Sequence, residues 1–379
     1  MLLAETDIQH HFLRDLATPR DPRSRFTFAN YLKEKGRLYD FGELALGAQG
    51  GAVSRLEWSD YLMWAADQLR GYVRYETEVL ALEPVRTGHQ IDRLRLITAQ
   101  GEMTARALVL ASGRIPAIPA EFDGGLGPTL LHSSQFRGAI EALDRTAPLR
   151  FAVVGSGQSA VEILAFLHGA FPASRLLSIH RGLGFKHVDL SQFSNEIFHP
   201  AFVDRFHSLD PDHRRTILRE ARQTNFGVVD AEAADVLYRR LYEDSVRSVQ
   251  RVEIRTGSQV GSWKDDAGVH RLRIEDVHTA EASDVEVDVV VLCTGYREEP
   301  LPWLLRPVAD LLTTDAEGNP QVGRDYRVDT DPELAVPIYL SGLSERTHGI
   351  SDAASFSMMA LRAERVLASL LEQARSRST

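Results

Sequence analysis

The sequence predicts an α/β protein, and three stretches of the chain carry that prediction. Residues 151–154 form an apolar, β-branched run that ends in a glycine turn. The apolar residues after this turn recur at helical spacing, which indicates a strand, a turn and a helix in succession. Two further expected strands, 107–113 and 285–293, also end in or beside a small residue and a glycine. Buried strands that alternate with helical segments are typical of the α/β class.

The turn after residues 151–154 has the spacing of a dinucleotide-binding turn. It consists of Gly155, Ser156, Gly157, Gln158, Ser159 and Ala160. In such a turn the first glycine permits the sharp bend, and the second lets a pyrophosphate approach the backbone. Ala160 lets the helix pack close to the strand, and the helix N-terminus offers free N–H groups to the phosphates. Residues 155–159 are therefore predicted to bind a nucleotide cofactor.

The end of the next strand indicates which nucleotide binds. A second strand is expected over residues 176–180, followed by Arg181 and soon afterwards by Lys186. An acidic residue at this point would accept hydrogen bonds from the ribose hydroxyls of NAD, whereas cations suit a 2′-phosphate. The sequence therefore favours NADPH, bound by Arg181 and Lys186. The alternative is that these are solvated surface cations.

Bulk composition excludes several classes of protein. The 379 residues carry a net charge of −10, which argues against nucleic acid or an anionic membrane as the main partner. A single cysteine, Cys293, excludes an internal disulfide framework. No apolar run approaches the ~20 residues of a membrane span, so we expect a soluble, cytoplasmic protein. The histidines between 187 and 213 lack metal-ligand spacing, and we expect no metal site.

Before the glycine turn, helical and loop segments are expected to give way to short strands. Residues 21–24 are typical of a turn that starts a helix, and glycines give 41–54 the composition of a flexible loop. An amphipathic helix over 59–69 follows, with Ser59 as its N-cap. Alternation then predicts a strand at 93–98, a second strand is expected at 102–106 after a Gln-Gly turn, and the apolar run 107–113 predicts a third.

After residue 187 the chain becomes charged and mostly helical in pattern. This segment, 188–223, interrupts the alternation of strands and helices, and another helix is expected over 235–247. The remaining expected elements are strands at 252–254, 272–274, 285–293 and 338–341 and a final helix at 353–374.

Several strings of residues, taken together and in order, resemble one family. They are DIQHHFLRDL at 7–16, DPRSRFTF at 21–28, NEIF at 195–198, TNF at 224–226, CTGY at 293–296 and HGISD at 348–352. This set is similar to the flavin-dependent N-hydroxylating monooxygenases, the ornithine and lysine side-chain amine hydroxylases of siderophore biosynthesis. The resemblance covers essentially the whole chain.

The resemblance implies a flavoprotein-like fold with two dinucleotide-binding domains. A Rossmann-type NADPH domain, 146–289, would be inserted in an FAD-type domain made of 1–145 and 290–379, with a helical insertion at about 188–230. The family carries its own FAD glycine fingerprint before the segment that matches residues 7–16. No such fingerprint precedes it here, so the FAD-type domain is expected to lack its N-terminal βαβ unit. A truncated start, a partner chain that supplies this unit, and unusual or absent FAD binding remain open.

The resemblance also implies the chemistry. NADPH and FAD would be the cofactors, and O2 and a primary amine the substrates. The free amine has a pKa near ~10.4, so deprotonating it at pH 7 costs roughly 4–5 kcal/mol, and a carboxylate beside it would be unfavourable. Asn195 and Asn225 match the family's two substrate-region asparagines, and Gln9 would lie near the flavin ring. Asn225 and Gln9 are the expected catalytic residues, and Arg14 stands where the family commonly has a carboxylate-binding lysine.

Four further residues match the cofactor region, namely Thr294, Gly295, Ser351 and Asp352. Phe226 replaces a tyrosine, and 353–356 departs from the family's Thr-Leu-Leu-Ser. These departures favour an alternative, a degenerate or flavin-free relative that binds NADP(H) or a partner chain without hydroxylating anything. A carbon-oxidising flavin monooxygenase is a third possibility. The expected assembly is a homo-oligomer, a dimer or tetramer, or a complex with a partner chain.

Overall fold

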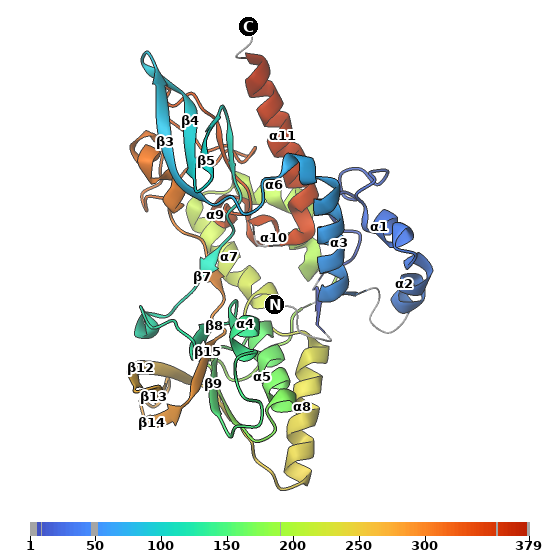
Figure 1. Ribbon diagram of the computed structural model, residues 1–379, viewed down its shortest axis with the longest axis vertical. Helices are drawn as coiled ribbons and strands as arrows, with labels where there is room; N and C mark the ends of the chain where they lie inside the picture. The colour runs from blue at the N-terminus through green and yellow to red at the C-terminus, as the bar shows by residue number, and fades with distance from the viewer. Residues whose placement is uncertain (1–5, 9, 47–51, 190, 354, 377–379) are drawn as a thin grey trace. The chain divides into compact units, whose positions relative to one another are not determined.

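The computed structural model describes residues 6–8, 10–46, 52–189, 191–353 and 355–376, and the side chains of 223–225 are also outside the described part. The chain forms two compact units, which are coloured along the sequence in Figure 1. Unit 1 comprises Met1–Thr6, Ile115–Ser194 and Arg219–Arg297. Unit 2 comprises Asp7–Arg114, Asn195–Leu218 and Glu298–Thr379. The assignment of NADPH and FAD to separate domains stays a prediction.

Unit 1 is organised around a five-stranded parallel sheet with the strand order β11-β10-β9-β15-β8. Its strands are β8 (Leu130–His132), β9 (Arg150–Val154), β10 (Arg175–Ile179), β11 (Val252–Arg255) and β15 (Val289–Leu292). Helices α5 (Gln158–Ala170) and α8 (Ala231–Val246) pack against each other beside this sheet (Figure 1). The predicted strand, glycine turn and helix are therefore confirmed as β9, the turn and α5.

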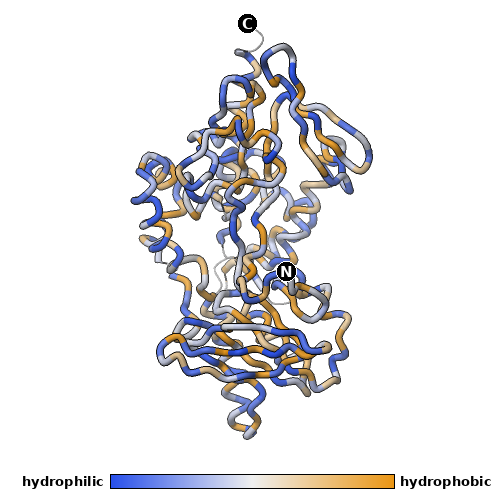
Figure 2. Tube along the Cα trace, turned by 90° about the vertical axis from the view of Figure 1, so that its left-hand side faces the viewer, coloured by the Kyte–Doolittle hydropathy of each residue, from blue (hydrophilic) through white to orange (hydrophobic). Residues whose placement is uncertain are grey.

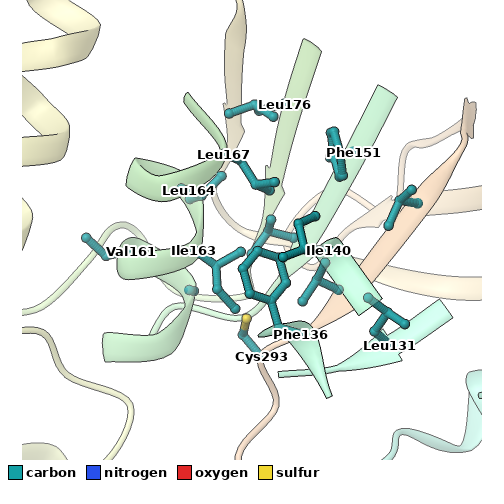
Figure 3. Close-up of a cluster of buried hydrophobic side chains, with 14 of the residues drawn as sticks. Leu131, Phe136, Ile140, Phe151, Val161, Ile163, Leu164, Leu167, Leu176 and Cys293 are labelled. Atoms are coloured by element: carbon teal, nitrogen blue, oxygen red, sulfur yellow. The ribbon is translucent and has the colours of Figure 1, made fainter. Parts of the chain in front are cut away.

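A core of buried side chains fixes α5 to the sheet. Val161, Leu164 and Leu167 lie on α5 at helical spacing and are fully buried with Phe151 of β9. Phe136, Ile140 and Cys293 belong to the same buried cluster, and Figure 3 shows the side chains of Ile163, Phe136 and Ile140 close together between α5 and the strands. Burying one such apolar side chain stabilises a fold by roughly 1.5–3 kcal/mol. The start of α5, which the glycine turn forms, is therefore held in a fixed position relative to β9.

A second sheet and a second core complete unit 1. The antiparallel strands β12 (Ser258–Asp266), β13 (Val269–Asp276) and β14 (Ala282–Val287) follow α8 and β11 along the chain. Along these strands, hydrophilic and hydrophobic residues alternate (Figure 2). Their inward side chains pack with those of the parallel sheet in one cluster, including Leu177, Val260, Leu272 and Val290. The smaller elements of the unit are β7 (Ile115–Pro116), η2 (Ala120–Phe122), α4 (Phe136–Ile140) and β16 (Tyr296–Arg297).

The prediction of one strand over 285–293 is wrong, because the chain changes sheets at Asp288. The Asp288 carboxylate accepts hydrogen bonds from the backbone N–H and the guanidinium of Arg150, both at 2.7 Å. The Asp288 N–H in turn donates to the carbonyl oxygen of Arg150 at 2.8 Å. These bonds end the antiparallel strand β14 and start the parallel strand β15.

Unit 2 combines small sheets with helices. Its sheets are the antiparallel β3 (Val79–Thr87), β4 (Gln90–Thr98) and β5 (Gly101–Ala105), the parallel pair β6 (Leu108–Leu110) and β17 (Ile338–Leu340), and the antiparallel pair β1 (Asp7–Ile8) and β2 (Val53–Ser54). Its helices include α1 (Phe28–Glu34), α2 (Leu38–Ala45), α3 (Arg55–Gln68), α6 (Pro200–Ser208), α9 (Glu345–His348), α10 (Ile350–Ala353) and α11 (Met359–Ser376). The 3-10 segments are η1 (Arg70–Tyr72), η3 (Ser194–Phe198), η4 (Trp303–Leu311) and η5 (Phe356–Met358). Helix α7 (Pro211–Asn225) has residues in both units.

Several predicted helix boundaries are wrong, and capping residues explain two of them. Helix α3 begins at Arg55 because the Ser54 hydroxyl, not that of Ser59, accepts a hydrogen bond from the N–H of Glu57. Helix α8 begins at Ala231 after the cap Asp230. The predicted loop over 41–54 contains the end of α2, and its residues 47–51 lie outside the described part. The expected final helix at 353–374 is α11, which begins only after η5.

No helix among the described residues is both long and apolar enough to cross a membrane.

Two neighbouring carboxylates in unit 2, the half-buried Glu298 and the buried Glu345, lead to a prediction about pH. The carboxylate of Glu298 accepts a hydrogen bond from the N–H of Glu345 at 2.9 Å, and Glu345, 3% exposed, forms an ion pair with Arg114 at 3.0 Å. Burial raises the pKa of Glu298 to about 7, aided by the charge of Glu345 and opposed by the hydrogen bond from the N–H of Glu345 and by the charges of Arg114 and Arg346. The folded state therefore holds this proton more tightly than the unfolded state does.

Protonated Glu298 is expected to stabilise the protein fully below its ordinary pKa, and this contribution is lost as the pH rises to about 7. Glu298→Gln, which is neutral at every pH, should remove that loss and raise the free energy of unfolding at pH 8 by about 2 kcal/mol relative to the wild type. Thermal unfolding at pH 5, 6, 7 and 8 measures the difference. Glu372→Gln, at an exposed position on α11, is the control. Parallel stability curves for Glu298→Gln and the wild type would contradict the prediction.

Candidate functional site

The glycine turn lies between the ends of two parallel strands. The N–H of Gly155 donates to the carbonyl of Ile179 on β10 at 2.9 Å, and the N–H of Cys293, just after β15, donates to the carbonyl of Val154 at 2.7 Å. Gly155 has φ +132°, and a Cβ atom there would collide with the carbonyl group of Cys293. Only glycine fits both conditions, so Gly155 is required by the fold itself.

The N-terminus of α5 offers hydrogen-bond donors. Its N-cap, Gly157, has no side-chain cap, and the N–H of Gln158 donates to the carbonyl of Val228 at 3.1 Å. Among the described residues, the N–H groups of Ser156, Gly157 and Ser159 donate to nothing, and these residues are half-buried rather than covered. Free N–H groups at a helix N-terminus bind anions such as phosphate. A Cβ on Gly157 would make only an ordinary contact, 3.5 Å from the Cα of Gly227.

Beyond β10 the chain presents two cations. His180 is buried, with its ring 4.9 Å from that of Phe185. Arg181 and Lys186 are exposed, and neither forms an ion pair within the part of the chain that the structure describes. The backbone holds Lys186 in place, because its carbonyl accepts a hydrogen bond from the N–H of Val229 at 2.7 Å. The end of β10 is therefore locally cationic.

Thr294 and Gly295 follow β15 in unit 1, and the fold uses their polar groups. The Thr294 hydroxyl donates to the carbonyl of Ala117 at 2.6 Å. The carbonyl of Gly295 accepts from the N–H of Ala117 and from Nε2 of His132, both at 2.9 Å. These two residues thus hold the segment after β7 in place.

In unit 2, Arg14 is the candidate for binding an anionic group. It is half-buried, with Nη1 3.2 Å from the hydroxyl of Ser357 and its guanidinium 5.5 Å from the ring of Phe198. Within the described residues it has no carboxylate partner. The adjacent Asp15 does not neutralise it, because that carboxylate accepts four hydrogen bonds from Ala17, Thr18 and Phe28. The charge of Arg14 thus has no counterion among the described carboxylates.

The predicted amide residues are only partly described. Asn195 lies on η3, three residues before the Phe198 ring that contacts Arg14, so both belong to unit 2. Asn225 is the last residue of α7 and belongs to unit 1, but its side chain lies outside the described part. Gln9 is outside the described residues altogether. The structure therefore places Arg14 and Asn195 in the same unit, and the roles of Asn195, Gln9 and Asn225 stay predictions.

Ser351 and Asp352 are completely buried on α10. The Asp352 carboxylate accepts from the Tyr326 hydroxyl at 2.5 Å and from Nη1 of Arg362 at 3.2 Å. Burial raises the pKa of Asp352, and the Arg362 charge and the Tyr326 hydrogen bond oppose that rise. The Ser351 hydroxyl has no hydrogen-bond partner among the described residues. Of this pair, Ser351 is therefore the one with an unused polar atom.

Sequence reasoning missed Tyr326 and Arg362, which hold Asp352. Tyr326 has φ +69°, unusual for a bulky residue, and its ring stacks on His348 at 4.1 Å. Tyr326 and Arg362 are separated from Asp352 by 26 and 10 residues in the sequence, so no local sequence pattern predicts these contacts. No group of side chains in the described ranges could hold a metal ion.

Comparison with known proteins identifies relatives over nearly the whole chain. The family model described as L-lysine 6-monooxygenase/L-ornithine 5-monooxygenase matches residues 1–298. L-ornithine N(5)-monooxygenase of Pseudomonas aeruginosa is 35% identical over 98% of this chain and 83% of that protein. The structure of L-lysine 6-monooxygenase from Pseudomonas syringae has a TM-score of 0.88 and 43% identity, covering 97% of this chain and 87% of that one.

A third relative was solved with its ligands. The ornithine N-hydroxylase of Kutzneria sp. 744, with reduced FAD, NADP+ and L-ornithine, has a TM-score of 0.91 and 36% identity over 98% of this chain and 89% of that one. The predicted fold class, an α/β flavoprotein-like fold with two dinucleotide-binding domains, is confirmed by these likenesses. The chain therefore belongs to the L-lysine 6-monooxygenase/L-ornithine 5-monooxygenase family.

Proposed function

We propose that this protein is an NADPH- and FAD-dependent monooxygenase that hydroxylates the side-chain amine of an amino acid such as ornithine or lysine. The observation that carries the proposal is Arg14, a half-buried guanidinium without a carboxylate partner among the described residues. A guanidinium binds a carboxylate with two parallel hydrogen bonds, which suits the main-chain end of an amino acid. The names of the relatives reported above agree with this substrate class.

The residues of unit 1 fit NADPH. The free N–H groups of Ser156, Gly157 and Ser159 would hold the pyrophosphate at the N-terminus of α5. Arg181 and Lys186 would bind the 2′-phosphate, which distinguishes NADPH from NADH. Two exposed cations without ion pairs in the described residues support that preference.

The residues that match the family's cofactor region also fit FAD, which supplies the oxygen chemistry when it is bound. Ser351 would hold it through the hydroxyl that is otherwise buried without a partner, since a buried hydroxyl is costly unless it is hydrogen-bonded. Asp352, fixed by Tyr326 and Arg362, would keep Ser351 and α10 in position. The resemblance also assigns Thr294 and Gly295 to the cofactor region and Gln9 to the neighbourhood of the flavin ring.

The substrate must present a neutral amine, because an ammonium group has no lone pair. The resemblance assigns Asn195 and Asn225 to substrate binding. Their amide groups are uncharged and would not stabilise the ammonium form of the amine. A carboxylate in the same place would stabilise the charged form instead. The product would be a side-chain hydroxylamine for a siderophore or another specialised metabolite.

The test is cofactor binding followed by turnover. The purified chain is incubated with excess FAD and desalted, and retained absorbance near ~450 nm reports bound flavin. NADPH or NADH is then supplied with L-ornithine, L-lysine or a diamine, and hydroxylamine formation is measured. We expect retained flavin, a preference for NADPH, and hydroxylamine from ornithine or lysine. Binding of NADP(H) without flavin or hydroxylamine would overturn the proposal in favour of a relative without hydroxylase activity.

A further inference from the structure

A histidine that lies close to Arg14 has an unused acceptor atom. The ring of His10 packs edge-on between Trp58 of α3, at 5.1 Å, and Phe356 of η5, at 5.4 Å. Its Nε2 atom is buried and has no hydrogen-bond partner in the described part of the chain. A buried polar atom without a partner destabilises the fold unless something else completes it. This atom therefore points to a ligand rather than to packing alone.

The protonation state of His10 follows from its surroundings. Nδ1 lies 3.2 Å from the carbonyl oxygen of His11, and a carbonyl only accepts, so Nδ1 carries the proton. Nε2 then presents a lone pair. Burial and the positive charge of Arg14 both lower the pKa of His10, which keeps the imidazole neutral at physiological pH. His10 is thus a hydrogen-bond acceptor beside a cation.

His10 and Arg14 are supported by the same segment. The hydroxyl of Ser357 accepts a hydrogen bond from Arg14, and the adjacent Phe356 packs on the ring of His10. The charge of Arg14 acts on His10 directly. One short stretch of chain, 10–14, therefore presents a guanidinium and a neutral imidazole acceptor against η5.

We propose that His10 and Arg14 form one subsite for the main-chain end of an α-amino acid substrate, with Nε2 of His10 accepting a hydrogen bond from the α-ammonium group. The inference rests on the proposed function and adds to it. In an α-amino acid the carboxylate and the ammonium are carried by the same carbon, so their receptors must be neighbours. Arg14 binds the carboxylate and His10 the ammonium. The subsite therefore selects amino acids over simple amines and over amino acids that lack the α-amino group.

The test compares substrates that differ only in the α-amino group. L-lysine is paired with 6-aminohexanoate and L-ornithine with 5-aminopentanoate. For each pair, binding to the full chain is measured by calorimetry and hydroxylamine formation by kcat/KM. In the wild type we expect a preference of about 10-fold or more for the α-amino acid. His10→Phe, which keeps the ring contacts with Trp58 and Phe356, should reduce that preference to about 2-fold or less.

The neighbouring histidine provides the matched control. His11 is exposed and its Nδ1 accepts from the N–H of Leu13, so His11→Phe should keep the wild-type preference. A wild type that does not distinguish the paired compounds overturns the inference without any variant, as does an unchanged preference in folded His10→Phe. Preferential binding of L-lysine or L-ornithine without hydroxylamine would instead reject the proposed function and keep the subsite. Failure to bind any of the four compounds rejects both.

Discussion

Gly155→Ala is expected to destabilise unit 1 by about 3 kcal/mol or more, and to remove NADPH binding with it. The φ of +132° at this position is accessible essentially to glycine alone. The added methyl group would also collide with the carbonyl group of Cys293, which the hydrogen bond to Val154 holds in place. Neither the backbone at residue 155 nor the carbonyl group of Cys293 can move away without breaking the contact between β9 and β15. Urea unfolding measures the loss of stability, and NADPH fluorescence titration measures the loss of binding.

Gly157→Ala, in the same turn, is expected to weaken NADPH binding while leaving the stability of the fold nearly unchanged. The φ of Gly157 is −88°, an ordinary value, and the new methyl group would meet only the Cα of Gly227 at 3.5 Å. We expect the free energy of unfolding to change by less than about 1 kcal/mol, while the affinity for NADPH falls because the methyl group stands where the pyrophosphate approaches. Equal destabilisation by the two substitutions would contradict this account.

Arg362→Leu is expected to destabilise the protein by about 3–5 kcal/mol, because it leaves the Asp352 carboxylate buried without its cation. Both side chains are almost fully enclosed, with exposed fractions of 10% and 0%. Arg362 also donates to the carbonyl oxygen of Asp352, so its loss removes a backbone contact of α10. Urea unfolding at neutral pH measures the effect.

Two further variants test that explanation. Arg365→Leu, on the same helix, breaks an ion pair with Asp204 in which both side chains are more than a third exposed, and should cost no more than about 1 kcal/mol. In the double variant Asp352→Asn with Arg362→Leu, no charge is buried alone, and part of the stability should return. If the double variant loses as much free energy of unfolding as the two single variants together, an uncompensated buried charge is not the cause.

Much of unit 1 could be predicted from the sequence because the signals there are local. The apolar run of β9, the glycine turn and the helical spacing in α5 all lie within about twenty residues of one another, and the structure has them in that order. The family resemblance, which rested on ordered strings rather than on one turn, is confirmed by the relatives. Periodicity failed at helix starts, since caps such as Ser54 and Asp230 precede the apolar pattern.

The contacts of the candidate site could not be predicted in the same way. Tyr326 and Arg362 reach Asp352 from ten or more residues away, and Phe356 reaches His10 from the other end of the chain. A paired His10 and His11 was visible in the sequence, but only burial shows that one ring has an unused nitrogen and that the other is exposed. Such differences arise from tertiary packing, which no local pattern contains.

The strand pair β6 and β17 has a consequence for the order in which the protein folds. The two strands pair in parallel, from Leu108 opposite Ile338 to Leu110 opposite Leu340, yet nearly all of unit 1 lies between them in the chain. A ribosome therefore completes the sheets of unit 1 while β6 still lacks its neighbour. Until residues 338–340 emerge, that strand presents unpaired backbone groups, which makes the unfinished chain a substrate for chaperones and a source of aggregation. Synthesis that stops before β17 would leave the sheets of unit 1 complete and β6 of unit 2 without its partner strand.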